Sequence, residues 1–240
     1  MRLYGKRSVT ERMHTNPKTI KRIYLQEKIS RPEVIGMARK HHIFVEMLPE
    51  KRFLQLAQKV NAQGVMAEID DFPYADLDDI ITQETKPTLI CLDRINDPQN
   101  LGVILRNCAC FGNFCIVLPK RETVEITEAV LKVACGAENY VPVVQVNTLS
   151  MVIQKAKEAG YWVGATLVKG GENPRQVNLN FPLCLVFGSE GEGIRTGLIK
   201  HIDYSLTLPM HGAGLSFNVA MAVGIFCYEI TCQRYNNAQK

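Results

Sequence analysis

Six short runs of apolar, largely β-branched residues recur through roughly the last two-thirds of the chain, and helical patterns separate most of them. These runs lie at residues 88–92, 114–118, 141–146, 161–167, 183–187 and 204–208. Continuous apolar strands that alternate with helices predict a parallel sheet covered by helices on both faces. Ligands of such sheets bind at the carboxyl ends of the strands, so the loops after Leu92, Leu167, Phe187 and Leu208 are candidate sites.

The first quarter of the sequence is strongly basic. Residues 1–60 contain 14 of the 28 lysines and arginines against five acidic residues, whereas residues 61–240 carry a net charge of −5. Helical patterns over 5–15, 32–41 and 49–61, with strand patterns over 19–26, 42–46 and 64–69, predict a small α/β domain. A folded basic domain attracts polyanions such as RNA, although the same charges could form an ordinary solvated surface.

An acidic segment follows the basic part. From Glu68 to Glu84 there are seven acidic residues, no basic residue and one proline, Pro73. This change of composition predicts a linker. We therefore expect a basic domain over residues 1–76, an acidic linker over 77–87 and a larger α/β domain over 88–240.

The loop after the first strand of the predicted sheet leads into a helix. Asp97 is expected to cap it and Pro98 to be its first residue, because proline has no amide to leave unpaired. Apolar residues at 101, 104, 105 and 108 form its buried stripe, and a glycine at 112 ends it. Asn100 and Arg106 have no obvious packing role and lie about 120° apart around the axis, so they need separate roles. For Arg106 the alternative is a surface salt bridge.

Two later loops combine glycines with polar residues. Residues 187–193 read Phe-Gly-Ser-Glu-Gly-Glu-Gly directly after a strand, and a carboxylate between glycines, Glu190, favours a site over a flexible turn. Residues 208–220 contain Ser216, which could simply cap the last helix, and Asn218, whose amide would need partners inside an apolar helix. Neither loop has the glycine spacing of a dinucleotide-binding fingerprint or of a Walker A loop.

The remaining features exclude several classes of protein. Eight cysteines follow no disulfide framework, and five of them lie in apolar runs, which favours a reducing, cytoplasmic location. No cysteine or histidine spacing is that of a zinc site. The basic start lacks the apolar core of a secretory signal, and the most apolar stretch, residues 215–228, is too short to cross a bilayer. We expect a soluble protein with no bound metal ion and no membrane partner.

The three polar loops, in this order, resemble the three motifs of the SpoU (TrmH) family of RNA 2′-O-ribose methyltransferases, in the SPOUT superfamily. The resemblance covers residues 88–235 and includes residues 132–142, Lys-Val-Ala-Cys-Gly-Ala-Glu-Asn-Tyr-Val-Pro. The basic part, which opens Tyr4-Gly5 and contains Val9, is similar to the family's ribosomal-protein-L30e-like RNA-binding domain. The resemblance implies an α/β chain with a trefoil-knotted parallel-sheet C-terminal domain. It also implies S-adenosylmethionine bound in the knot, and a homodimer with its active sites at the interface.

The resemblance also implies, position by position, which residues form the site. The catalytic set is Asn100, Arg106, Glu190, Ser216 and Asn218, and the cofactor-binding set is Thr166, Gly188, Leu208, Met210 and Phe217. Three positions depart from the family: Arg94 stands where glycine is frequent, Phe217 where leucine is, and Ala220 where serine is. The apolar helix over 219–232 would form part of the dimer surface.

The implied reaction is methyl transfer from S-adenosylmethionine to a ribose 2′-hydroxyl of RNA. The two-domain layout is most similar to bacterial enzymes that methylate a guanosine ribose in 23S rRNA, and a tRNA guanosine is the alternative target. A non-catalytic RNA-binding protein is a second alternative, while the missing fingerprint argues against a nucleotide-dependent oxidoreductase. The chemistry requires alignment and deprotonation of the hydroxyl. Because a guanidinium seldom loses its proton, we expect Arg106 to hold the neighbouring phosphate instead of acting as a base.

Overall fold

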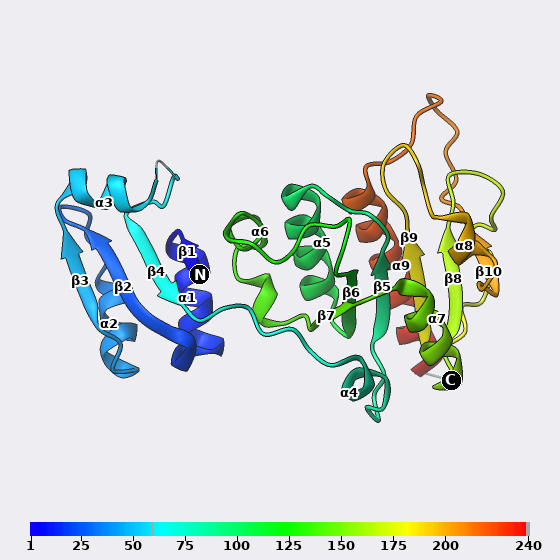
Figure 1. Cartoon of the computed structure of the whole chain (residues 1–240), viewed down its shortest axis with the longest axis horizontal. Coiled ribbons are helices and arrows are strands. Elements are labelled where there is room, and N and C mark those ends of the chain that lie inside the picture. Colours follow the sequence, from blue (N-terminus) through cyan, green and yellow to red (C-terminus); the bar gives the residue numbers. More distant parts are fainter. Residues whose placement is uncertain (59, 239–240) are drawn as a thin grey trace. The chain divides into compact units, whose positions relative to one another are not determined.

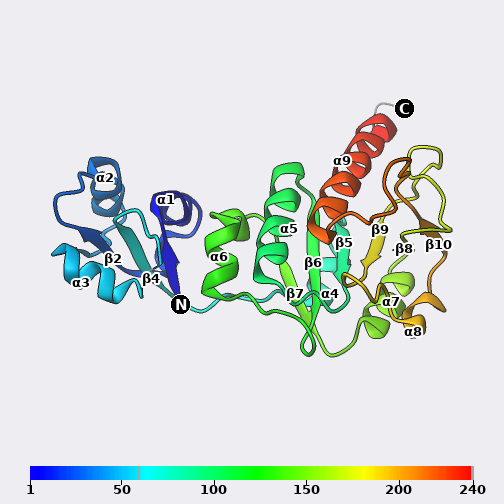
Figure 2. The ribbon, with the colours of Figure 1, turned by 90° about the horizontal axis from the view of Figure 1, so that it is seen from above.

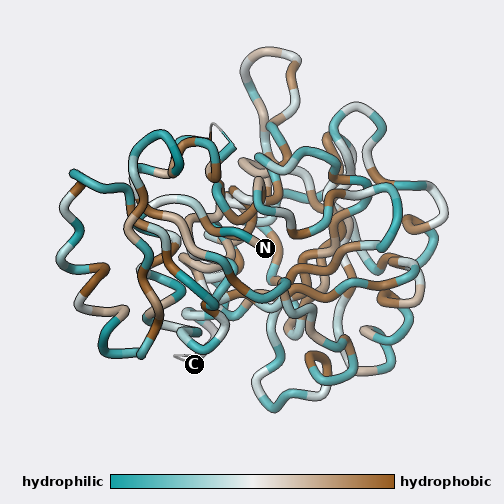
Figure 3. The backbone as a smooth tube through the Cα atoms, turned by 60° about the vertical axis from the view of Figure 1, so that its left-hand side comes forward, coloured by the Kyte–Doolittle hydropathy of each residue, from teal (hydrophilic) through white to brown (hydrophobic). Residues whose placement is uncertain are grey.

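The computed structural model describes residues 1–58 and 60–238, which divide into two compact units (Figure 1). The first unit comprises Met1–Pro73 together with Ile126–Asn139, and the second comprises Tyr74–Glu125 together with the chain from Tyr140 onward. Each unit is built on its own β-sheet. Hydrophobic stretches of the backbone lie mostly in the interior, and many of the outer turns are hydrophilic (Figure 3). Among the described residues no helix has the length and apolar character needed to cross a membrane.

The sheet of the first unit has the strand order β1-β4-β2-β3. Its strands are β1 (Arg2–Tyr4), β2 (Ile20–Gln26), β3 (Val45–Leu48) and β4 (Val65–Ile69), with β2 and β3 parallel and β4 antiparallel to both β1 and β2. Helices α1 (Lys6–Thr15) and α2 (Pro32–Lys40) lie on one face, and α3 (Glu50–Leu56) lies on the other (Figure 2). A short 3₁₀ helix, η1 (Pro17–Thr19), leads into β2. The small α/β architecture predicted for the basic part is therefore present.

Details of this unit differ from the sequence prediction, and the helix predicted over 49–61 already ends at Leu56. Strand β1 was not predicted, because three residues are too few to show an alternating pattern; its pairing with β4 defines it. The strand predicted over 42–46 begins at Val45, since His42 adopts a left-handed φ of 55° and the Ile43 amide still bonds to the Ala38 carbonyl at 2.9 Å. The turn that follows α2 thus occupies the first residues of the predicted strand.

The second unit contains the six-stranded parallel sheet expected from the apolar runs. Its order is β10-β8-β9-β5-β6-β7. The strands are β5 (Thr88–Leu92), β6 (Phe114–Pro119), β7 (Val143–Val146), β8 (Trp162–Thr166), β9 (Leu183–Phe187) and β10 (Tyr204–Leu206). Every run predicted as a strand forms one. The strands are buried along most of their length except β10, an edge strand in which only Leu206 is buried.

Helices cover both faces of this sheet. Helices α5 (Pro98–Phe111) and α9 (Val219–Ala238) pack together on one face, while α4 (Leu77–Ile81), α7 (Leu149–Glu158) and α8 (Thr196–Ile199) cover the other (Figure 2). Phe187 of β9 meets Phe226 of α9 edge-on at 5.5 Å. The cysteines in apolar runs are free and buried, and burial raises the pKa of the Cys115 thiol, as expected for packing residues.

The segment predicted as an acidic linker is different in the structure. Its first residues form α4, whose Leu77, Ile80 and Ile81 are buried in the core of the second unit. Asp76 caps this helix by accepting from the Asp78 amide at 2.8 Å, and acidic residues are favourable at a helix start. The acidic composition therefore begins a packed helix, and the prediction of a linker over 77–87 does not hold for these residues.

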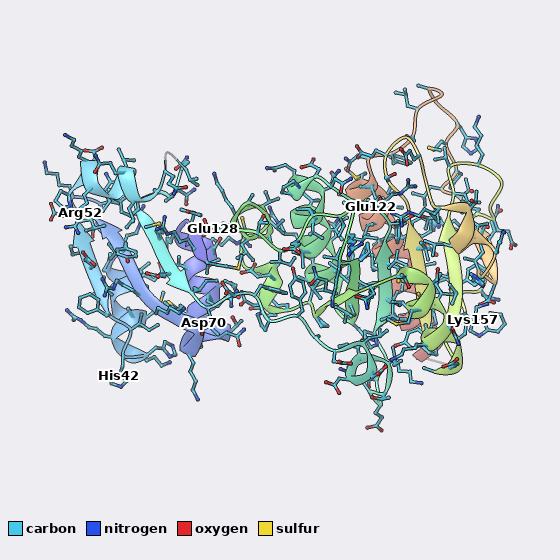
Figure 4. The ribbon with its side chains drawn as sticks, viewed as in Figure 1. His42, Arg52, Asp70, Glu122, Glu128 and Lys157 are labelled. Carbon is cyan, nitrogen blue, oxygen red and sulfur yellow. The ribbon has the colours of Figure 1, made fainter. Side chains whose placement is uncertain are left out.

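The first unit also includes a segment that lies far along the chain. Helix α6 (Glu128–Ala134) and the 3₁₀ helix η2 (Ala137–Asn139) pack with the N-terminal residues. Glu128, labelled in Figure 4, accepts hydrogen bonds from the Arg2 amide at 2.8 Å and from the Tyr4 hydroxyl at 2.9 Å. Arg12 and Glu138 form an ion pair at 3.3 Å with both side chains buried. Residues 88–240 consequently do not form one uninterrupted compact unit.

Candidate functional site

The first polar loop leads from β5 into α5. Asp97 Oδ1 accepts from the Gln99 amide at 2.8 Å and Pro98 is the first helical residue, so the predicted cap is confirmed. All four residues of the predicted stripe are buried, and Gly112 ends the helix with a φ of 72°. This start places Asn100 in the first turn of α5, at the carboxyl end of β5.

A tight turn at residues 188–193, the Glu190 turn, follows β9. The Gly193 amide donates to the Ser189 carbonyl at 3.0 Å, and Gly191 and Gly193 have positive φ angles of 91° and 68°. A Cβ at Gly188 would lie 2.2 Å from the carbonyl carbon of Gly193, so only glycine fits there. The turn has a defined geometry, and Glu190 lies exposed on it.

Asn100, Glu190 and Asn218 form a hydrogen-bonded group, the polar cluster. The Asn218 Nδ2 donates to Glu190 Oε1 at 2.6 Å and to Asn100 Oδ1 at 2.9 Å, and the Asn100 Nδ2 donates to Glu190 Oε1 at 3.3 Å. Glu190 Oε2 accepts no hydrogen bond from the residues that the structure describes. It is therefore available to accept one from a hydroxyl of a bound molecule.

Asn218 has a second function in the fold. Its Oδ1 accepts from the Ala220 amide at 2.9 Å and from the Met221 amide at 3.4 Å, so Asn218 caps α9. The sequence prediction of a buried amide inside the helix is wrong, because α9 begins one residue later and Asn218 is exposed. Ser216, the alternative cap, is exposed and makes no hydrogen bond with the described residues.

Arg106 is the one member of the first motif that the structure leaves outside the polar cluster. Its side chain is exposed and forms neither an ion pair nor a hydrogen bond within the described part of the chain, so the surface salt bridge is not formed. The helix that carries it is firmly packed: Asn107 Nδ2 donates to the Ala220 carbonyl at 2.9 Å, and Gly224 lets α9 approach that amide. Arg106 is thus an unpaired cation on a packed helix, open to an external anion.

Four of the five residues expected at the cofactor lie at or just after the ends of three neighbouring strands. Thr166 ends β8, Gly188 follows β9, Leu208 and Met210 follow β10, and Phe217 directly precedes the cap of α9. Thr166 Oγ1 donates to the Val186 carbonyl at 3.1 Å, which ties β8 to β9. Leu208 is buried, Met210 is half-buried and Phe217 is 44% exposed.

The backbone of residues 208–212 offers unused hydrogen-bonding groups. None of its amides or carbonyls bonds to another described residue, whereas the preceding Thr207 amide donates to the Glu172 carbonyl at 2.8 Å. Backbone groups without internal partners can bind the polar edge of a planar ligand such as a nucleobase. The donors and acceptors present here fit the adenosine part of S-adenosylmethionine.

Sequence reasoning gave no role to Asp93, which directly follows β5. Its carboxylate is 1% exposed and accepts from the Arg195 amide at 3.0 Å and pairs with the Arg195 Nε at 3.3 Å. Its own amide donates to the Phe187 carbonyl at 2.8 Å. Asp93 therefore joins the loops after β5 and β9. In the sequence, the feature that could have identified Asp93 is an acidic residue directly after a buried strand. No group of three or more potential metal ligands is found among the described side chains.

Comparisons with known proteins match both parts of the chain. The model of the SpoU rRNA Methylase family matches residues 87–228, and that of RNA 2′-O ribose methyltransferase substrate binding matches residues 2–75. An uncharacterized tRNA/rRNA methyltransferase of Synechocystis is 37% identical over 88% of this chain, which spans 56% of that relative's length. The 23S rRNA (guanosine-2′-O-)-methyltransferase RlmB of Pseudomonas putida is 31% identical, with 97% of this chain and 96% of that protein covered.

A solved structure agrees with these relatives. The AdoMet-bound rRNA methyltransferase from Sinorhizobium meliloti superimposes with a TM-score of 0.79 at 26% identity, covering 95% of this chain and 85% of that one.

Proposed function

Because this chain belongs to the SpoU rRNA Methylase family, we propose that it methylates the 2′-hydroxyl of a guanosine ribose in 23S rRNA. Family membership makes it an S-adenosylmethionine-dependent RNA methyltransferase with the α/β SPOUT fold. The polar cluster is the observation that carries the proposal. Three loops that are up to 118 residues apart in sequence supply it, and it leaves one carboxylate oxygen free.

The main task of the site is to activate the nucleophile, the ribose 2′-hydroxyl. S-adenosylmethionine supplies a sulfonium methyl that is already activated. A ribose hydroxyl is a weak nucleophile until its proton leaves, so the site must align and polarise it. In our proposal Glu190 Oε2 accepts a hydrogen bond from the ribose, while Asn100 and Asn218 hold the carboxylate in place.

Arg106 is assigned to charge stabilisation. A guanidinium keeps its proton at neutral pH, so it does not serve as the base. Its exposed, unpaired side chain on a packed helix suits a bidentate contact with the phosphate next to the target ribose, with the developing alkoxide nearby. Ser216, exposed in the same loop as Asn218, is proposed to contact the RNA or the cofactor.

The cofactor is proposed to lie against the ends of β8, β9 and β10. The backbone of residues 208–212 would hold the adenine, with Thr166, Gly188, Met210 and Phe217 around it. We propose that these loops form the trefoil knot expected of the family, one of the rare departures from unknotted topology. The basic first unit, with the L30e-like RNA-binding role, would hold a structured part of the RNA.

We further propose a homodimer formed through α9. Met221, Tyr228 and Tyr235 are spaced by seven residues and are 57%, 58% and 66% exposed, so they form one apolar stripe along the helix. Val103 of α5 is also exposed, at 38%, and Tyr228 contacts Phe111 edge-on at 6.2 Å. An apolar stripe of this kind on a helix is typical of a protein–protein interface. A cytoplasmic location follows from an rRNA substrate.

The test is methyl transfer from labelled S-adenosylmethionine to 23S rRNA and to total small RNA, both from a host that lacks the corresponding methylation. Ribose methylation is then mapped by nucleotide. Label on one 23S guanosine ribose supports reaction and target together, and the Glu190→Gln variant should slow that methyl transfer strongly while leaving a measurable rate. Label on tRNA instead would replace the target with the alternative. Cofactor binding without transfer to any RNA would support the non-catalytic RNA-binding alternative.

A further inference from the structure

Arg94 ties the Glu190 turn to the loop after β5. Its guanidinium forms an ion pair with Glu192, and its Nη2 donates to the Gly193 carbonyl at 3.2 Å. Its Nε lies 3.8 Å from Asp93 Oδ2. The Arg94 side chain is 21% exposed and Glu192 is 72% exposed, so water screens the ion pair, whereas the contact with the Gly193 carbonyl is partly buried.

The backbone at Arg94 makes these contacts informative. Arg94 has a φ of 61°, in the left-handed region that favours glycine. A residue with a side chain is strained there, so glycine would be the more stable choice for the loop alone. The guanidinium contacts with Glu192 and the Gly193 carbonyl offset this strain.

The far end of the Glu190 turn is fixed independently. Arg195 donates its amide to Asp93 and forms an ion pair with Glu122, which Figure 4 labels. At the start of the turn, the Gly188 backbone lies so close to Gly193 that no Cβ would fit there. Glu190 lies in the middle of the turn. Arg94 contacts the residues that follow it, through the ion pair with Glu192 and the hydrogen bond to the Gly193 carbonyl.

We propose that Arg94 is a positioning residue that holds the Glu190 turn so that the Glu190 carboxylate stays aligned in the polar cluster. It acts through Glu190 and touches neither RNA nor cofactor. This inference rests on the proposed function for its kinetic consequence, but its structural consequence can be measured without any turnover.

The structural test compares amide hydrogen exchange in the wild type and in Arg94→Gly, Arg94→Lys and the control Arg121→Gly, all as full chains. Arg121 is exposed and makes no hydrogen bond or ion pair with the described residues. We expect Arg94→Gly to raise exchange at least about tenfold at the Gly193 amide, which donates to the Ser189 carbonyl, without lowering the melting temperature, because glycine relieves the strain. Arg94→Lys should protect the turn partly, and Arg121→Gly should match the wild type. Unchanged exchange in Arg94→Gly would overturn the proposal.

The kinetic test separates positioning from general stability. Arg94→Gly should lower kcat for methyl transfer roughly tenfold, with KM for RNA and for S-adenosylmethionine within about twofold of the wild type. Combined with Glu190→Gln, it should cause no further loss, because both changes act on the same carboxylate. An equal tenfold loss in the Glu190→Gln background would overturn the proposal. If the wild type transfers no methyl group, the proposed function fails, while the exchange result still decides the role of Arg94.

Discussion

At the scale of single residues, Asn218 combines two roles that can be separated by substitution. Asn218→Asp keeps the side-chain oxygen that caps α9 but replaces the Nδ2 donor to Asn100 and Glu190 with a carboxylate oxygen that repels Glu190. We expect its free energy of unfolding to stay within about 1 kcal/mol of the wild type, and kcat to fall roughly a hundredfold. Urea unfolding and single-turnover methyl transfer measure the two effects.

Asn218→Ala is the matched control for this change. It removes the cap as well as the donor, so it should lose about 1 kcal/mol of stability beyond the aspartate variant. Wild-type turnover in Asn218→Asp would show that the donor to Glu190 has no part in the reaction.

Arg106 offers a sharper test of mechanism, because its side chain has no hydrogen bond or ion pair to lose among the described residues. Arg106→Lys keeps the charge but not the planar pair of donors. We expect kcat to fall roughly 10- to 100-fold with an unchanged melting temperature, as measured by steady-state transfer to RNA. Arg121→Lys serves as the control for loss of an exposed guanidinium. Near-normal turnover of Arg106→Lys would make a bidentate role untenable.

At the scale of elements, the contact between α1 and η2 depends on a buried ion pair. Burial raises the pKa of the Glu138 carboxyl, and the Arg12 charge opposes that rise. The folded chain thus keeps the Glu138 proton to a higher pH than the unfolded chain does. The contribution of Glu138 to the free energy of unfolding therefore decreases as the pH rises above the ordinary pKa of a glutamate carboxyl. The loss is complete once the pH exceeds the raised pKa.

Removing the cation should enlarge this pH dependence. Arg12→Met leaves Glu138 buried without its partner, and we expect about 3 kcal/mol of destabilisation at pH 7. The cost should be smaller near pH 4.5, where the carboxyl is protonated. Urea unfolding of the full chain at both pH values measures it, and Arg12→Met with Glu138→Gln should recover most of the loss at pH 7. A cost independent of pH would show that the pair contributes only packing.

The elements themselves were largely predictable. Asp97, Pro98 and Gly112 mark both ends of α5 correctly, because caps are local interactions between neighbouring residues. The prediction of an acidic linker was wrong because it also used only local information. The charges of the segment indicate exposure to water, whereas the burial of Leu77, Ile80 and Ile81 depends on contacts with distant strands and with α7. Strand β1 exists only through its pairing with β4.

At the scale of the whole molecule, the stripe on α9 predicts self-association. The wild type should sediment at twice the chain mass of 27.0 kDa, and Tyr228→Glu should shift it towards the monomer, since a charge is costly in an apolar interface. Val168→Glu, at a residue that is 55% exposed outside α9, is the control. A monomeric wild type, or equal dissociation constants for wild type and Tyr228→Glu, would refute the dimer.

The sequence by itself determined the parallel sheet, the basic α/β unit and the three polar loops, because apolar periodicity, charge and caps are properties of neighbouring residues. It also singled out Asn100, Glu190 and Asn218. Only the tertiary structure decided that these three meet in one cluster, that Asn218 caps α9 and that Asp93 and Arg94 brace the Glu190 turn. Contacts between loops about 100 residues apart depend on strand order and on backbone angles, and neither can be inferred from a short stretch of sequence.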